Sequence, residues 1–380
     1  MKSSLSNRFD RFAFRIIDVA NITNYIKDRN LFAYPEVRAK IEYLKAYPGI
    51  SGSFPCLFCF EASKGEIICS VWAIPDRLHC YGGVYSWAWL SSLMTSPAHQ
   101  RRGFAAYLLG QAIKSFHAIG CASGGMFATS ASKRLLTKRL GMILPGYVSR
   151  LFLVASFDLL LETHIPDWVY KRFLVSLLRI FSKRFIRSVR TQAVRWRRAA
   201  VSKAISWNDM NVIDSEIRKS QPKADYWFAN SGTIALLKAS AAAVADGSES
   251  NFYSLETRHG ERIGYFILRR NWQQRALRGN RRGFWRVTLI DYGISLSYPG
   301  AHRLLAKEVV FRFLESGAAL LDVASSEKPL MTAFRKSYLI GIHKKASLNF
   351  TYPSSWHLQR SCMDIKHWHL TRSSGDGFLF

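Results

Sequence analysis

One short stretch, Gln100-Arg101-Arg102-Gly103-Phe104-Ala105, guides the interpretation of this chain. It lies between an apolar, strand-like run at 85–94 and an amphipathic run at 105–119 with helical spacing. A glycine at a strand-to-helix turn lets backbone N–H groups approach an anion, and the start of a helix adds about half a positive charge. The stretch therefore predicts an anion-binding turn.

The order of the neighbouring segments gives this turn its meaning. The same Arg-Arg-Gly-Phe string recurs at 281–284, but there it precedes a strand and opens no helix. The other elements of this region are expected in the following order: a strand at 12–18, helices within 21–47, strands at 54–62 and 67–74, then, after the turn and its helix, a strand at 124–129, a helix at 130–140 and a strand at 147–155.

This order of strands and helices around a glycine turn resembles the GNAT acyltransferases over residues 1–155. The resemblance implies that acetyl-CoA, or another acyl-CoA, is the co-substrate, and that no metal takes part. It also implies which residues bind the coenzyme: Leu93, Met94 and Thr95 along the pantetheine arm, and Gln100, Arg101, Arg102, Gly103, Phe104 and Ala105 around the pyrophosphate.

The resemblance further implies direct acyl transfer in a ternary complex. A backbone N–H within Leu93 to Thr95 polarises the thioester carbonyl while an amine or hydroxyl attacks it. The family often protonates the departing thiolate with a tyrosine in a Y-x-x-L-G pattern. This chain has Thr137 at that position, and threonine is a poor general acid. Water, Ser130 or another group therefore has to serve, or the reaction needs no acid catalyst.

The general base is open at this point. From Arg77 to Phe157 the chain has no Asp or Glu, which suits an anionic coenzyme but leaves the central strands without a carboxylate. An imidazole has the unperturbed pKa closest to neutrality, although an isolated histidine in this setting often has a structural role. The candidates are Glu61, Asp76, His79, Tyr85 and Asp291.

The second half repeats the rhythm of the first. Its turn before the helix at 301–316, residues 295–302, lacks the Q-x-x-G-x-A loop. The half resembles the second domains of tandem GNAT proteins associated with bacterial polysaccharide loci. The predicted fold is α/β, with tandem GNAT-like folds of two mixed β-sheets flanked by helices. Its parts are an acyl-CoA-binding domain at 1–157, a basic amphipathic helical linker at 158–222 and a degenerate second domain at 223–380.

Basic residues dominate the linker. The chain carries a net charge of +28, and residues 168–208 contain no acid. Apolar residues recur at helical spacing from 173 to 185, with arginines and lysines largely elsewhere around the helix. Three roles are open: binding an anionic membrane surface, binding RNA phosphates, or packing against the flanking domains.

Composition limits the setting. The chain of 380 residues has no uncharged apolar run of about 18 residues and no signal-like N-terminus, so neither a membrane-spanning helix nor a secretion signal is expected. Six cysteines do not form a disulfide framework, and Cys56 and Cys59 are expected to be buried thiols on a strand. A cytoplasmic location follows, peripheral to the inner face of the membrane if the linker binds lipid.

The sequence thus predicts a GNAT-type N-acetyltransferase that moves an acetyl or other acyl group from acyl-CoA to an amine or hydroxyl. The sequence leaves the acceptor open: it is a small molecule or a saccharide, and an amino sugar is one candidate. A Fem-like aminoacyl transferase is one alternative: the positive charge suits its aminoacyl-tRNA, but the CoA-type loop argues against it. The other alternative is a catalytically inactive binding protein at the membrane surface.

Overall fold

The structure is a computed structural model. It describes residues 9, 11–80, 83–126, 130–156, 176–177, 180, 184, 186–189, 191, 200–220, 226–228, 237–241, 243, 247–277, 280–336, 340–356, 360–371 and 374.

The first half follows the predicted order of elements. These are β1 (Ala13–Asp18), α1 (Ile22–Asp28), the 3₁₀ turn η2 (Leu31–Ala33), α2 (Pro35–Ala46), β2 (Pro55–Glu61), β3 (Ile67–Cys80), β4 (Gly83–Thr95), the 3₁₀ turn η3 (Pro97–His99), α3 (Phe104–Ala118), β5 (Ala122–Met126), α4 (Ser130–Arg134), the π-helical turn η4 (Leu135–Arg139) and β6 (Ile143–Val154).

Helices cover both faces of the first half's sheet. Successive side chains of a strand point to opposite faces, and β2 illustrates this. Phe58 and Phe60 pack in the cluster that contains the buried face of α3. Leu57 and Cys59 pack in the cluster that contains residues of α1 and α2. The sheet is therefore buried on both sides, which explains its nearly continuous apolar strands.

The second half has a matching set of elements. These are β7 (Ala200–Ala204), α7 (Trp207–Ser220), β8 (Tyr226–Phe228), β9 (Glu249–Thr257), β10 (Arg262–Leu277), β11 (Asn280–Ile294), α9 (Ala301–Glu315), β12 (Leu320–Ser325), α10 (Lys328–Arg335), β13 (Ile340–Thr351), the 3₁₀ turns η5 (Arg360–Met363) and η6 (Ile365–His367), and β14 (Trp368–His369).

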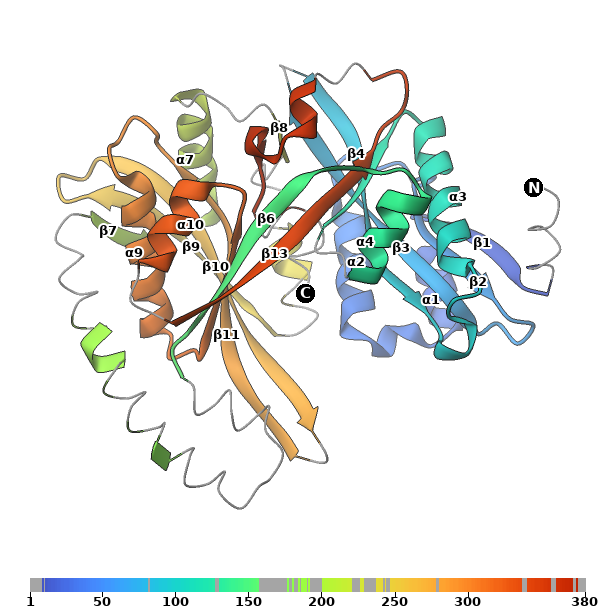
Figure 1. Cartoon of the computed structure of the whole chain (residues 1–380), viewed down its shortest axis with the longest axis horizontal. Coiled ribbons are helices and arrows are strands. Elements are labelled where there is room, and N and C mark those ends of the chain that lie inside the picture. The colour runs from blue at the N-terminus through green and yellow to red at the C-terminus, as the bar shows by residue number, and fades with distance from the viewer. Residues whose placement is uncertain are drawn as a thin grey trace.

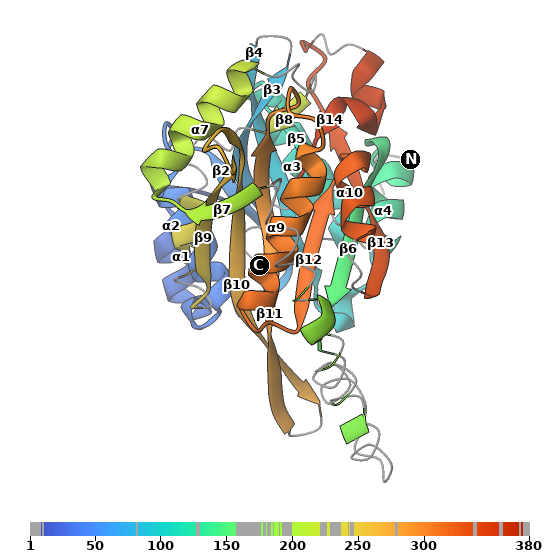
Figure 2. The same cartoon turned by 90° about the vertical axis from the view of Figure 1, so that its left-hand side faces the viewer.

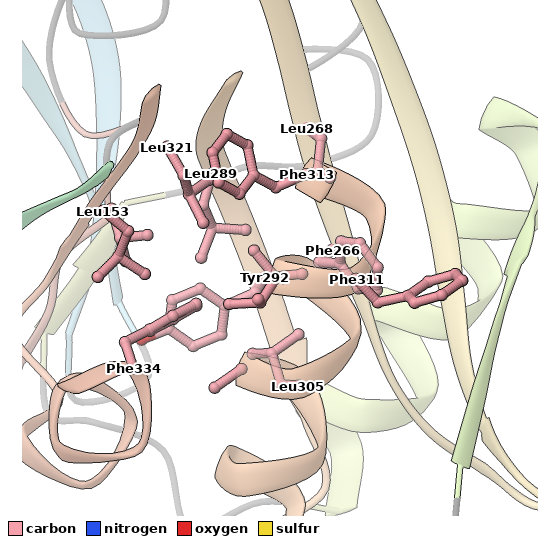
Figure 3. Packing of buried hydrophobic residues seen from close by; sticks show 14 of the residues in the cluster. Leu153, Phe266, Leu268, Leu289, Tyr292, Leu305, Phe311, Phe313, Leu321 and Phe334 are labelled. Carbon is pink, nitrogen blue, oxygen red and sulfur yellow. The ribbon is translucent and has the colours of Figure 1, made fainter. Parts of the chain in front are cut away.

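The second half is also covered on both faces, and a strand of the first half helps to fill its core. In β10, Phe266 and Leu268 pack with α9, whereas Tyr265 and Ile267 pack with α7. Figure 3 shows Leu153, which belongs to β6 of the first half, lying beside the side chains around α9.

The two halves exchange strands at the centre of one continuous sheet. β13 of the second half lies between β5 and β6 of the first, and β6 pairs in turn with β12. The predicted α/β fold, with a mixed sheet flanked by helices, is confirmed, but the prediction of two separate sheets is wrong. Figure 1 shows β6 and β13 crossing between the halves. The strand order is β1-β2-β3-β4-β5-β13-β6-β12-β11-β10-β9-β7.

The segment predicted as linker is partly built into the second half. β7 pairs with β9, and α7 packs on β9, β10 and β11. In contrast, β8 pairs with β3 of the first half. Most of the predicted basic helix, including Arg179, Lys183 and Arg190, lies outside the described residues.

All six cysteines are buried free thiols, which confirms the interpretation of Cys56 and Cys59. Trp87 and Trp89 are core residues, as expected, with 1% of each exposed. Among the helices that the structure describes, none is long and apolar enough to cross a membrane.

Candidate functional site

The turn between β4 and α3 has the backbone that an anion-binding loop requires. The side-chain amide of Gln100 donates a hydrogen bond back to the carbonyl of Thr95 at 3.2 Å. Arg101 (φ 62°) and Gly103 (φ 94°) both have left-handed backbone, and Gly103 is the N-cap of α3. Left-handed backbone costs a non-glycine residue about 1–3 kcal/mol. The fold thus holds Arg101 in a conformation that its own side chain disfavours.

The space beside Gly103 is open. A Cβ atom built on Gly103 would lie 3.9 Å from the Phe9 ring, its nearest neighbour. In the described part of the chain, no side chain caps the start of α3, and its first turn has no acidic residue. The first N–H groups of α3 are therefore available to an anion, and the helix dipole favours one there.

Loop side chains divide into exposed and buried ones. Arg101 and Arg102 are exposed, where their guanidinium groups can meet phosphate. Phe104 is 2% exposed, and its ring packs against those of Phe9 and Phe60 at 4.8 and 5.1 Å. The predicted ligand role of Phe104 is thus restricted to its backbone, because its ring anchors the loop to the core.

β4 has a bulge near its end, and its pairing with β5 stops just before this bulge. Ser92 has left-handed backbone (φ 49°), and the register of β4 against β3 shifts between Ser70 and Trp72. The parallel pairing of β4 with β5 stops at Trp89, although β4 continues to Thr95. Leu93, Met94 and Thr95 lie on this part of β4, and Met94 is 58% exposed. The structure thus brings the predicted coenzyme residues of β4 and of the loop to one end of the sheet.

Lys40 is a residue of this region that the sequence analysis missed. It lies on α2 and is 1% exposed, and its Nζ donates to Ser92 Oγ at 2.7 Å. The Nζ also lies 5.1 Å from the centre of the Trp72 ring. Lys40 therefore fixes the side chain of the bulge residue. The only sequence signal was its place among the apolar positions of a predicted helix.

Thr137 lies in η4, which packs on β5, the strand whose pairing with β4 stops at Trp89. A Cβ on Gly125 of β5 would lie 3.8 Å from the neighbouring Leu136. The Thr137 hydroxyl donates to the Lys133 carbonyl at 2.9 Å, so a role as proton donor requires it to give up this bond. Ser130 is the first residue of α4, and its side chain lies outside the described part of the chain.

His79 and Tyr85 lie at the opposite end of β3 and β4, which corrects their predicted place in the site. Tyr85 precedes Leu93 by eight residues on β4, which corresponds to about 25 Å of extended strand. His79 stacks on Trp227 at 5.3 Å between ring centres, and Tyr85 packs against Trp356 at 4.6 Å. Both rings thus support the contact between β3, β8 and the C-terminal region.

Asp291 does not reach the first half's loop either. It is 1% exposed on β11, where it accepts hydrogen bonds from Thr371 Oγ1 at 2.9 Å and from the Tyr265 hydroxyl at 3.3 Å. Because β5, β13, β6 and β12 alternate in direction, β11 runs opposite to β4. The C-terminal ends of β4 and β11 therefore lie at opposite ends of the sheet, measured along the strands.

The other acidic candidates are buried carboxylates that are held in ion pairs. Glu61 is 4% exposed and pairs with Arg15 at 3.3 Å and with Arg29. Asp76 is 3% exposed, accepts a hydrogen bond from Trp89 Nε1 at 2.9 Å, and pairs with Lys238 at 3.5 Å. These contacts give both carboxylates a structural role.

In the second half, the C-terminal tail packs against the end of β11, the strand that corresponds to β4. β11 leaves β12 after Leu289, and the register against β10 shifts at that point. Thr371 bridges Ser325 of β12 and donates to Asp291 of β11. The tail therefore lies beside the end of β11, the strand that corresponds to β4 of the first half. The turn itself is kept, since Gly300 is a left-handed N-cap of α9 (φ 79°).

A carboxylate with two imidazoles fixes this tail. Glu327, the N-cap of α10, meets His302 Nε2 at 2.9 Å and His369 Nδ1 at 2.8 Å. Burial alone would raise the pKa of the Glu327 carboxyl, but the hydrogen bonds with His302 and His369 outweigh it and hold the pKa well below its ordinary value. The arrangement ties the tail to α9 and α10.

The fold is similar to that of Saccharomyces cerevisiae N-myristoyltransferase. Against its structure with bound myristoyl-CoA, the TM-score is 0.58 at 11% identity, covering 90% of this chain and 82% of that chain. A protein of unknown function from Enterococcus faecalis V583, described as a probable N-acyltransferase, gives a TM-score of 0.52 at 9% identity, with 89% and 72% covered. No protein-family model and no curated protein sequence matches this chain.

Proposed function

We propose that this chain is an acyltransferase that moves an acyl group from acyl-CoA to an amine or hydroxyl. The observation that carries the proposal is the turn at Gly103, an open, left-handed helix N-cap directly after a strand that separates from its neighbour. The similarity in fold to an N-myristoyltransferase with bound myristoyl-CoA supports it.

In this proposal the pyrophosphate of acyl-CoA lies on the N–H groups at the start of α3, close to Arg101 and Arg102. The pantetheine arm follows Leu93, Met94 and Thr95, and a backbone N–H of this stretch polarises the thioester carbonyl. The acceptor amine or hydroxyl attacks that carbonyl, so that the new C–N or C–O bond forms as the C–S bond breaks. The acceptor's proton finally neutralises the thiolate of CoA.

Positioning is the main catalytic contribution in this proposal. His79, Tyr85 and Asp291 lie away from the turn, so none of them is assigned as the base there. Thr137 and Ser130 are the proposed sources of a hydrogen bond to the departing sulfur. Orientation of two bound reactants is by itself a large part of the rate enhancement in such reactions.

The finer assignments rest on the sequence resemblance. We propose N-acetyl transfer from acetyl-CoA, a saccharide such as an amino sugar as acceptor, and a cytoplasmic enzyme that works close to the membrane. A Fem-like aminoacyl transferase would bind aminoacyl-tRNA in place of acyl-CoA. An inactive binding protein would release no CoA with any acceptor.

The test is calorimetric titration of the chain with acetyl-CoA, with myristoyl-CoA and with transfer RNA. Gly103→Glu places a carboxylate in the space assigned to the pyrophosphate and should abolish CoA binding. Gly300→Glu is the matched control, since Gly300 is also a left-handed N-cap with open space beside it (φ 79°). Equal CoA affinity in both variants, or binding of transfer RNA alone, would contradict the proposal.

A further inference from the structure

β10 and β11 continue beyond the sheet as a two-stranded ribbon. Their mutual pairing extends to Leu277 and Asn280. The pairing of β10 with β9 ends at Arg270, and that of β11 with β12 begins at Arg286. Figures 1 and 2 both show the ribbon projecting from one end of the molecule. A two-stranded ribbon is marginally stable by itself in water, so a partner surface would favour it.

The ribbon and the adjoining strands are rich in arginine. Residues 262–290 contain no Asp, Glu or Lys. In the backbone register of the two strands, Arg275 is paired with Arg282. An anionic surface would attract a stretch with this excess of positive charge. The arginines are Arg262, Arg269, Arg270, Arg275, Arg278, Arg281, Arg282 and Arg286.

Two tryptophans lie across the ribbon from each other. The rings of Trp272 and Trp285 are in edge contact at 5.2 Å, and the Arg270 guanidinium lies 4.1 Å from the Trp285 ring. Trp272 is 45% exposed. A Cβ on Gly283 would come within 2.5 Å of the Trp272 ring, so Gly283 makes room for this indole. Exposed tryptophan beside arginine suits the interface between water and lipid headgroups.

Exposed aliphatic side chains at the end of the molecule that carries the ribbon favour lipid over nucleic acid as the partner. Leu177 is 38% exposed and Ile180 is 56% exposed. Figures 1 and 2 place the described fragments of 176–189 at the same end of the molecule as the ribbon. Nucleic acid would use the arginines and an aromatic ring, but it offers no apolar phase to the aliphatic side chains. A bilayer interface accommodates all three kinds of residue.

We propose that the β10–β11 ribbon docks on an anionic phospholipid bilayer, with its arginines on lipid phosphates and Trp272 at the headgroup level. This surface is independent of the coenzyme turn. It holds whether or not the chain transfers acyl groups.

The test is flotation of the full chain with phosphatidylcholine vesicles that contain or lack phosphatidylglycerol. In the triple variant Arg275→Gln, Arg281→Gln and Arg282→Gln, each lost charge should weaken binding about fivefold. The partition coefficient should therefore fall on the order of 100-fold. Trp272→Ser should weaken binding in a way that added salt does not reproduce, because its contribution is not ionic.

The control is a triple variant with the same charge loss on exposed residues of the first half, Arg38→Gln, Lys45→Gln and Lys114→Gln. It should keep most of the wild-type partition coefficient. Unchanged melting temperatures show that both triple variants are folded, and the Trp272→Ser variant tests the surface without any change of charge. Equal vesicle binding by the two triple variants would overturn the proposal. A second result would also overturn it: the wild-type chain binds RNA but not vesicles, and the ribbon triple variant no longer shifts RNA in a gel.

Discussion

Arg150 and Asp322 join the two halves by a buried ion pair at the strand exchange. Arg150 of β6 donates from Nε to Asp322 Oδ1 at 2.9 Å and from Nη2 to Oδ2 at 2.6 Å. The carboxylate is fully buried, whereas 20% of the arginine side chain is exposed. Replacing Arg150 with Met leaves a buried carboxylate without its main partner, and we expect a loss of about 3–5 kcal/mol in unfolding free energy.

The reverse replacement should cost less. In Asp322→Asn the arginine keeps an acceptor of the same shape and an exposed edge in water, so a loss of about 1–3 kcal/mol is expected. The unfolding free energy of the double variant should be close to that of Asp322→Asn alone, because no buried charge is then unpaired. The two substitutions would therefore couple by about 3–5 kcal/mol, which is the whole cost of Arg150→Met alone.

The assay is guanidinium unfolding followed by circular dichroism and by tryptophan fluorescence. Because the halves share a sheet, both signals should show one transition, and Arg150→Met should shift its midpoint for both. A midpoint that Arg150→Met leaves unchanged, or a shift confined to one of two separate transitions, would refute the reasoning.

Further predictions concern the thiols and the tail. Burial raises the pKa of Cys56 and of Cys121 to about 12, so we expect no reaction of native cysteines with a disulfide reagent at about pH 8, whereas all six react after denaturation. Glu327→Gln should cost about 2 kcal/mol of unfolding free energy at neutral pH, since it weakens the hydrogen bonds with His302 and His369. The folded state lowers the pKa of Glu327, so its ionised contribution is complete above the unfolded value of about 4.3 and declines as the pH falls below it. Urea midpoints of wild type and Glu327→Gln should converge in acid, and a constant gap down to low pH would contradict this assignment.

Local patterns were sufficient to predict the turn and the order of elements. The conformation at Gly103 follows from a glycine between a strand and a helix, and that preference needs no distant partner. The burial of Cys56 and Cys59 on β2 likewise follows from the continuous apolar run of this strand.

Partners that are distant in sequence could not be predicted in this way. The exchange of β6 and β13 depends on which strand edges meet in space. The apolar pattern of a single strand does not specify which strand it pairs with. Asp291 and His79 were plausible bases by chemistry, but the antiparallel centre of the sheet and the pairing with β8 place them away from the turn. Lys40 was missed because a lysine on a predicted helix is usually exposed.

Hydrogen–deuterium exchange with and without saturating acetyl-CoA tests the central claim most directly. Acyl-CoA in the first half should protect the backbone amides of residues 93–106. The equivalent residues 290–302 and the tail at 368–371 should exchange as in the free chain, since the tail already packs against the end of β11 there. Protection at 290–302 without protection at 93–106, or no protection of either stretch, would contradict the account.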